Sequence, residues 1–214
     1  MAVFDLQTNL PKNVRKQTEA LDEYYYSIDT ASIPVINSWL DFNGYTNSYA
    51  MLGEELVGYY NLMPIKESTA RAFFNGMLKE EDITTEHMLS AQEMRKAQYF
   101  YLPAITVKDY KSYRSRQAVA ALISGMASHL LSMFDLPNLK AIYANPTTYQ
   151  GNMLINKMGF QPLYRNKRPL GAGNDIYVLS FEGDALDRLR RIEQRYSRFV
   201  GKNPWPELGR TGIN

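Results

Sequence analysis

The chain has 214 residues, 45% of them hydrophobic and 21% charged, so it is long enough to bury a core and has an ordinary globular composition. Its formal net charge of +2 gives no strong attraction to nucleic acid, and no uninterrupted apolar run approaches the length of a membrane span. The lack of cysteine excludes disulfides, thiolate metal sites and cysteine nucleophiles, and the presence of only two histidines excludes a histidine-rich metal centre.

The first part of the chain alternates between segments with a helical spacing of apolar residues and segments rich in aromatic and β-branched residues. We expect helices over residues 13–21 and 32–42. We expect strands over residues 23–30, 45–52 and 56–63. Gly53 lies between the last two of these strands, where a turn-compatible residue predicts a hairpin.

The connection from Pro64 to Lys96 is longer than a hairpin needs. Two stretches in it, 67–78 and 83–94, have the apolar stripe of a helix. We therefore expect a helical insertion between the third and fourth strands. It would form either the wall of a binding cleft or extra helices packed on an edge of the sheet.

The most informative stretch, residues 97–160, predicts a strand, a crossover helix, a second strand and a second helix. The strands are expected over 97–107 and 139–144, and the helices over 112–134 and 149–158. Gly159 follows the second helix, where glycine commonly ends a helix. Such a unit places two parallel strands side by side and can present a helix N-terminus to an anion.

The last part of the chain predicts strands over 161–164 and 175–181, separated by a basic, glycine-rich loop. That loop contains Arg165, Lys167 and Arg168. Residues 184–200 predict an amphipathic helix whose polar face is rich in arginine.

This order of elements, with the sequence INKMGF before a further strand, resembles the acyl-CoA-binding half of the GNAT superfamily of N-acetyltransferases. The resemblance implies an α/β fold with a mixed central sheet of about six to seven strands flanked by helices. It also implies an acyltransferase domain over residues 1–182, with its donor-binding unit at 97–160. The helix within 183–200 would pack on this domain, and 201–214 would form a tail.

In the GNAT family the first of these strands leads to an Arg/Gln-x-x-Gly-x-Gly/Ala loop that holds the CoA pyrophosphate. Arg114 fits the start of this pattern, but Gln117 and Val119 stand where the family prefers glycine. A register that starts at Arg116 rescues the last position alone, with Ala121. Main-chain contacts do not require glycine, although glycine lets the phosphates come close. The donor-binding residues that the resemblance implies are Ile105, Thr106, Val107, Arg114, Ser115, Arg116, Gln117, Ala118 and Val119.

Many members of the family place a tyrosine two turns before the Gly-Phe pair, as general acid to the leaving thiolate. That position is Ile155 here. Asn152 lies about one turn earlier and Tyr149 at the start of the same helix, so these two are the candidate catalytic residues.

The general base would be a carboxylate, or a water held by one. Glu54, Glu55 and the acidic residues of the run 79–82 qualify by location alone, and such a charge run is typical of solvated surface. His129 falls on the apolar face of the central helix, which predicts a core histidine. His87 is expected at the surface.

Three functions stay open from the sequence. The first is an N-acyltransferase that moves an acetyl or other acyl group from acyl-CoA to a small-molecule or peptide amine. The second resembles long-chain N-acyl amino-acid and acyl-homoserine-lactone synthases, whose donor, acyl carrier protein, would suit the basic loop at 165–168. The third is a binding module that kept the fold without the chemistry, which Gln117, Val119 and Ile155 favour.

We expect acetyl-CoA or another acyl-CoA as co-substrate, no metal and no membrane partner. A fourth function, nucleic-acid binding through the arginine-rich helix at 184–200, is disfavoured, because the net charge is near neutral and this helix has its own apolar face to bury. The amino-terminal residues lack the basic and apolar segments of a secretory signal, so a cytoplasmic location is expected. A homodimer is compatible with the sequence.

Overall fold

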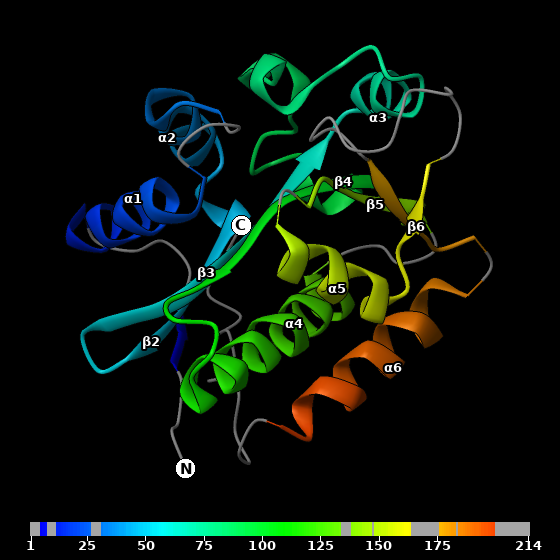
Figure 1. The fold of residues 1–214 in the computed structure, drawn as a ribbon. Coiled ribbons are helices and arrows are strands. Elements are labelled where there is room, and N and C mark those ends of the chain that lie inside the picture. Colours follow the sequence, from blue (N-terminus) through cyan, green and yellow to red (C-terminus); the bar gives the residue numbers. More distant parts are fainter. Residues whose placement is uncertain are drawn as a thin grey trace.

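The computed structural model describes residues 5–7, 12–26, 31–133, 138–146, 148–163, 176–182 and 184–199. A seven-stranded sheet separates two layers of helices (Figure 1). Its strands follow the order β1-β2-β3-β4-β5-β7-β6. Neighbouring strands of the described sheet are antiparallel except for β4 and β5, which are parallel. This is the mixed α/β architecture that the sequence predicted.

The strands are β1 (Asp5–Gln7), β2 (Asn47–Leu52), β3 (Glu55–Ile65), β4 (Tyr99–Val107), β5 (Ala141–Ala144), β6 (Gln161–Pro162) and β7 (Tyr177–Ser180). The α-helices are α1 (Lys12–Tyr26), α2 (Ile33–Phe42), α3 (Glu67–Phe74), α4 (Tyr113–Met133), α5 (Tyr149–Met158) and α6 (Ala185–Ser197). Short 3-10 helices occur at Gly44–Thr46, Glu80–Asp82, Thr85–His87 and Met94–Lys96.

The two faces of the sheet carry different helices (Figure 1). α4, α5 and α6 cover one face, and α1, α2 and α3 cover the other. Side chains alternate between these layers along each strand. On β4, Phe100 and Leu102 therefore pack in the α4 layer, while Tyr101 stacks on Phe73 of α3.

β4 contains a bulge. β3 pairs Asn61 with Ala104 and Met63 with Tyr101, so β4 has one extra residue between these two pairs. Pro103 lies in the bulge, where its missing N–H removes no ladder hydrogen bond.

The sheet opens just beyond this bulge. The last pair between β4 and β5 joins Leu102 to Ala144, where β5 ends. β4 continues to Val107, paired with β3 alone among the described strands. The two parallel strands therefore lose contact halfway along β4.

The predicted strand at 23–30 is wrong where the structure describes it, because α1 continues to Tyr26. Val14, Thr18 and Asp22 recur at every fourth residue and turn toward the sheet, so the helical repeat outweighs the strand preference of three consecutive tyrosines. Residues 27–30 lie outside the described residues.

The predicted helix at 83–94 is also wrong. Its first turns are irregular, because their backbone groups bond to other parts of the fold. The carbonyl oxygen of Ile83 accepts the indole N–H of Trp39, and Leu89 N–H donates to Pro64. Met88 forms a bridge with Ile65, the last residue of β3. The helical insertion itself is present between β3 and β4, in the form of α3 followed by 3-10 turns.

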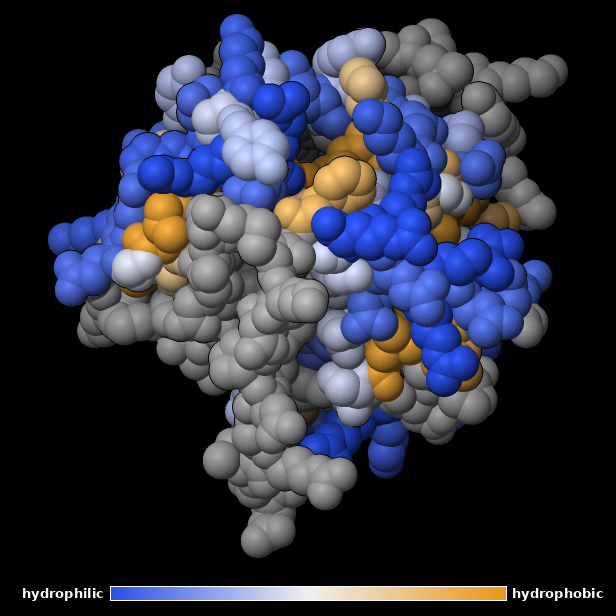
Figure 2. All heavy atoms as spheres, turned by 90° about the horizontal axis from the view of Figure 1, so that it is seen from below, coloured by the Kyte–Doolittle hydropathy of each residue, from blue (hydrophilic) through white to orange (hydrophobic). Residues whose placement is uncertain are grey.

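α6 packs along α4, and its Leu189 is buried in the same core. The basic loop with Arg165, Lys167 and Arg168 and the tail at 201–214 fall outside the part of the chain that the structure describes. None of the described helices is long and apolar enough to cross a membrane. Seen from below, the coloured part of the surface is mostly hydrophilic, with hydrophobic side chains in separate groups (Figure 2).

Candidate active site

A first cleft lies where β4 and β5 lose contact, on the face covered by α4 and α5, and we call it the donor cleft. Its lining residues are Leu102, Pro103, Ile105, Ala144, Asn145, Pro146, Thr148, Gly151, Leu154 and Ile155. Thr148 caps α5, accepting the N–H of Gly151 through Oγ1 at 3.0 Å. The strand ends and the first turns of one helix thus form its walls.

Main-chain groups of β4 face the donor cleft. Lys108 N–H donates to Val57 O of β3 at 2.8 Å. Because backbone groups of successive residues in an antiparallel strand point to opposite sides, this bond determines which residues of β4 point toward β3. The backbone groups of Thr106 therefore point to β3, whereas those of Ile105 and Val107 point to the side where β5 has ended. These two residues can pair with the amides of an elongated ligand.

Asn145 adds a polar side chain to the donor cleft. It follows the end of β5 and is 8% exposed. Its Oδ1 is buried and has no hydrogen-bond partner within the described structure. A buried acceptor without a partner is costly, so this oxygen favours a ligand that donates a hydrogen bond there.

The start of α4 follows the open end of β4. Ser112 accepts the N–H of Ser115 through Oγ at 3.1 Å and the N–H of Arg116 through its carbonyl at 3.2 Å. The hydroxyl of Ser115 donates to Lys108 O. These bonds fix the loop between β4 and α4, and the positive end of the helix dipole lies there.

The predicted phosphate-binding residues differ in their exposure to solvent. Arg114 and Arg116 are exposed at the start of α4, while Gln117 and Ala118 are buried and Val119 is half-buried. Inside a helix the amides of residues 117–119 bond to carbonyls one turn earlier. The first turn of α4, rather than these three residues, can therefore face an anion.

The two predicted catalytic residues do not line the donor cleft. Tyr149 is 75% exposed, and Asn152 Oδ1 accepts the side-chain N–H of Asn156 at 2.6 Å. Ile155 does line the cleft and offers an alkyl group where the family carries a tyrosine. Thr148 contributes a hydroxyl to the lining of the donor cleft. Its Oγ1 accepts the Gly151 N–H, so the hydroxyl proton can still be donated to a ligand.

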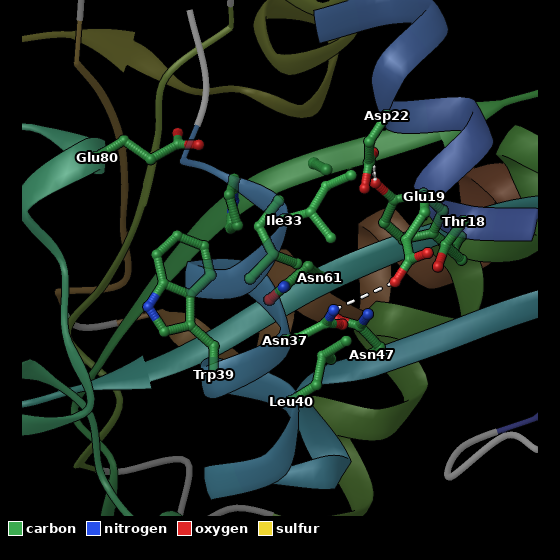
Figure 3. A pocket seen from close by; sticks show the side chains of 14 residues that line it. Thr18, Glu19, Asp22, Ile33, Asn37, Trp39, Leu40, Asn47, Asn61 and Glu80 are labelled. Carbon is green, nitrogen blue, oxygen red and sulfur yellow. Dashed lines mark hydrogen bonds between the residues drawn. The ribbon is translucent and has the colours of Figure 1, made fainter. Parts of the chain in front are cut away.

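A second cleft lies on the opposite face of the sheet, beneath α1 and α2, and we call it the acceptor cleft (Figure 3). Its lining residues are Thr18, Glu19, Asp22, Ile33, Ile36, Asn37, Trp39, Leu40, Asn47, Tyr59, Asn61, Glu80, Pro103 and Ala104. Three of them are carboxylates. No lysine, arginine or histidine of the described ranges lines this cleft.

Asn61 lies between two tyrosine–carboxylate pairs, and the carboxylate of each pair lines the acceptor cleft. On one side, two residues earlier on β3, the hydroxyl of Tyr59 donates to Asp22 Oδ1. On the other side, on β4, the hydroxyl of Tyr101 donates to Glu80 Oε2. Alternate residues of a strand are about 7 Å apart on one face, so the Tyr59–Asp22 pair and the carboxamide of Asn61 lie a short distance apart on the floor of the cleft.

Burial shapes the electrostatics of these groups. Burial raises the pKa of Asp22 to about 6; the hydrogen bond from Tyr59 opposes this shift and the nearby Glu19 adds to it. Burial and the adjacent Glu80 hold the pKa of Tyr101 well above its usual value. Asp22 is therefore a carboxylate that can take up and release a proton near neutral pH.

The two clefts meet at Pro103. This residue lines both of them and lies in the bulge of β4, beside the end of β5. Ligands bound on opposite faces of the sheet can therefore approach each other at this one point.

Asp22 and Asn61 were not predicted from the sequence as site residues, and Glu80 qualified as a general base by location alone. Asp22 lies beside the mistaken strand, and Glu80 belongs to an acidic run interpreted as solvated surface, although its side chain is half-buried. The sequence did contain a signal for Asn61: a carboxamide in the middle of an apolar strand is a buried polar group that needs a hydrogen-bond partner, and this can indicate a site residue.

No protein-family model and no curated protein matches the sequence. Solved structures match the fold. Ard1 from Thermoplasma volcanium has a TM-score of 0.51 at 10% identity, over 83% of this chain and 95% of that one. A GNAT-family acetyltransferase from Staphylococcus aureus Mu50 has a TM-score of 0.50 at 10% identity, over 84% of this chain and all of that one (100%).

N-acetylglutamate synthase from Neisseria gonorrhoeae, in complex with coenzyme A and N-acetyl-glutamate, has a TM-score of 0.51 at 10% identity. The match covers 84% of this chain and 35% of that enzyme. These likenesses show that the chain has the GNAT acetyltransferase fold, as its order of elements predicted.

Proposed function

We propose that the chain is an N-acyltransferase that moves an acyl group from acyl-CoA to an amine. The observation that carries this proposal is the meeting of the donor and acceptor clefts at Pro103. A donor and an acceptor bound on opposite faces of the sheet can react there without displacing each other. The GNAT fold supports this assignment, although a fold alone does not define a substrate.

The donor is acyl-CoA in this proposal. Its pantetheine amides pair with the backbone groups of Ile105, which lines the cleft, and of Val107, which point away from β3 on the same side. Its pyrophosphate lies at the first turn of α4, where Arg114 and Arg116 add charge-assisted hydrogen bonds. The thioester then lies beside Pro103.

In the reaction the amine nitrogen attacks the thioester carbonyl carbon, a C–N bond forms, the C–S bond breaks and CoA leaves as its thiolate. Thr148 can donate a hydrogen bond on the donor side. We assign no role in this step to Tyr149 or Asn152, because neither lines the donor cleft.

A binding module without catalysis is the second candidate. The observation in its favour is Ile155, whose alkyl side chain lines the donor cleft where a proton donor would assist the leaving thiolate. A thiolate of CoA leaves without a general acid in principle, so this observation lowers the expected rate rather than excluding the reaction.

A thermal-shift titration with CoA, acetyl-CoA and a long-chain acyl-CoA tests the donor site. A ligand at about a hundred times its dissociation constant should add about 2.7 kcal/mol of stability. The Arg114→Ala/Arg116→Ala double variant should weaken the shift. Its matched control is Arg190→Ala/Arg198→Ala, which removes two exposed arginines near α6 and should leave the shift unchanged.

Each outcome of this titration decides something. A shift with acetyl-CoA that the first double variant alone weakens supports the donor site. Preference for the long chain moves the assignment to the long-chain relatives. The absence of a shift with any thioester overturns acyl-CoA as the donor. Binding of a thioester without amide formation from any amine supports the binding module instead of the enzyme.

A further inference from the structure

The acceptor cleft contains two buried carboxamide oxygens that need a hydrogen-bond donor. Asn47 and Asn61 are 2% and 4% exposed, and the Oδ1 atom of each has no hydrogen-bond partner within the described residues. Asn47 donates its own side-chain N–H to the hydroxyl of Tyr49 at 3.1 Å, which orients its oxygen. Figure 3 shows both side chains among the residues that line the cleft.

The charged side chains that line the cleft all have one sign, and Arg15 is a positive charge near Tyr49, behind Asn47, that pairs with Asp41. Glu19, Asp22 and Glu80 line the cleft, and its described lining includes no basic side chain. Glu19 accepts a hydrogen bond from Asn37 at 3.2 Å, and the other two accept from tyrosines. A ligand that carries its own carboxylate would be repelled here, whereas a primary ammonium supplies three donors and no acceptor.

The wall opposite the strands is apolar. Ile33, Ile36 and Leu40 of α2 line it. Trp39 is held in place, because its indole N–H donates to Ile83 O at 3.0 Å. This wall can bury the hydrocarbon part of a ligand, at about 25 cal/mol per Å² of apolar surface removed from water.

We propose that the acceptor cleft selects a primary amine with an apolar body and no carboxylate, and that Asp22 accepts the proton of its ammonium group. This inference rests on the proposed function, since it names the acceptor of that reaction. The ammonium group is held by the oxygens of Asn47 and Asn61, and its hydrocarbon lies against α2.

The proton balance of the step is simple. The ammonium group must lose one proton before its nitrogen lone pair can attack, and a second as the amide forms. Asp22 Oδ takes up the first proton, directly or through one water, and returns it to solvent after the product leaves. The second proton neutralises the CoA thiolate.

Two matched probes test the substrate class. 2-Phenylethylamine has an ammonium group and an apolar body, and L-phenylalanine differs from it by one carboxylate beside the nitrogen. We expect acetylation of the amine with a kcat/KM at least about a hundredfold higher, because a buried unpaired carboxylate is strongly disfavoured. Similar values for the two would overturn the substrate class while leaving the acyltransferase intact.

Asp22→Asn tests the proton acceptor. We expect kcat to fall by about 10² or more and the acidic limb of the kcat/KM–pH profile, near the pKa of Asp22, to disappear. The control is Glu23→Gln, the same chemical change one residue later on the exposed side of α1. A merely structural Asp22 would not move the limb, so a variant that keeps it overturns the role of Asp22.

Failure of this inference is distinguishable from failure of the proposed function. Binding of both probes is measured by thermal shift in the presence of CoA, without turnover. If 2-phenylethylamine stabilises the protein more than L-phenylalanine does but neither is acetylated, the selectivity stands and the acyltransferase falls. If L-phenylalanine stabilises the protein as strongly, the selectivity falls.

Discussion

Tyr60 of β3 and His129 of α4 meet in the core, with 3.3 Å between Tyr60 Oη and His129 Nδ1. Ser48 Oγ donates to Tyr60 Oη at 2.9 Å and extends this polar chain across the layer. His129 is 4% exposed, so the sequence prediction of a core histidine is confirmed. Burial lowers the pKa of His129 to about 4.

His129 should make the stability depend on pH. Its folded pKa lies below the usual 6.5, so the unfolded chain binds a proton first as the pH falls, and folded stability is lost between about pH 6.5 and 4. This difference corresponds to about 3 kcal/mol. Urea unfolding of wild type and His129→Gln should show a free-energy difference that shrinks by about this amount from about pH 7.5 to 4. A difference that stays constant would contradict the buried neutral imidazole.

The contribution of Asp22 to folding stability should change with pH in the opposite direction. Its folded pKa of about 6 lies above the usual 3.8, so its contribution is fully present below pH 3.8 and is lost as the pH rises through about 6. Asp22→Asn should therefore stabilise the protein by about 1 to 3 kcal/mol at about pH 8 and change little near pH 3.8. The measurement is urea unfolding at both pH values. Equal loss of stability at both would show that the Tyr59 hydrogen bond matters more than desolvation.

The order of elements was predictable because local signals define most of it. α5 has the bounds that its spacing predicted, and Gly159, which ends it, has a φ of 95° that favours glycine. α2 likewise begins and ends within one residue of its expected range. Such segments carry their own caps and turns, and a single sequence contains that information.

The acceptor cleft was not predictable for the converse reason. Asp22 and Asn61 acquire their surroundings from α1 and β3, and nothing near either residue in the sequence indicates the other. The turns after α3 depend on Trp39 and Pro64, whose hydrogen bonds replace those of the helix predicted over 83–94. Tertiary partners decided these features.

Trp39 should hold the insertion that carries Glu80. Its indole N–H donates to Ile83 O in the core. Trp39→Phe leaves this carbonyl without its donor and opens a small cavity, so we expect a loss of about 2 to 4 kcal/mol. Hydrogen exchange should speed up around residues 80–88, and the acetyl-CoA shift should persist because the donor cleft lies on the other face. Unchanged exchange in that segment would show that other contacts hold it.

Gly58 of β3 should matter to the path of β4, which borders the donor cleft. An ideal Cβ on this residue would lie 2.6 Å from Thr106 O, a backbone atom of β4 that cannot move alone. Gly58→Ala should therefore displace β4 near Ile105 and Val107. We expect a loss of about 3 kcal/mol and a weaker acetyl-CoA shift.

Gly53→Ala is the matched control for this change. Gly53 has a φ of +62° and its added Cβ meets nothing within 4 Å, so the substitution should cost about 1 to 2 kcal/mol of backbone strain. Because Gly53 lies in the hairpin turn between β2 and β3, away from β4, the acetyl-CoA shift should be unchanged. Chemical denaturation and the thioester titration on both variants give the comparison. Equal effects on donor binding would show that the path of β4 beyond the bulge does not depend on close packing against Gly58.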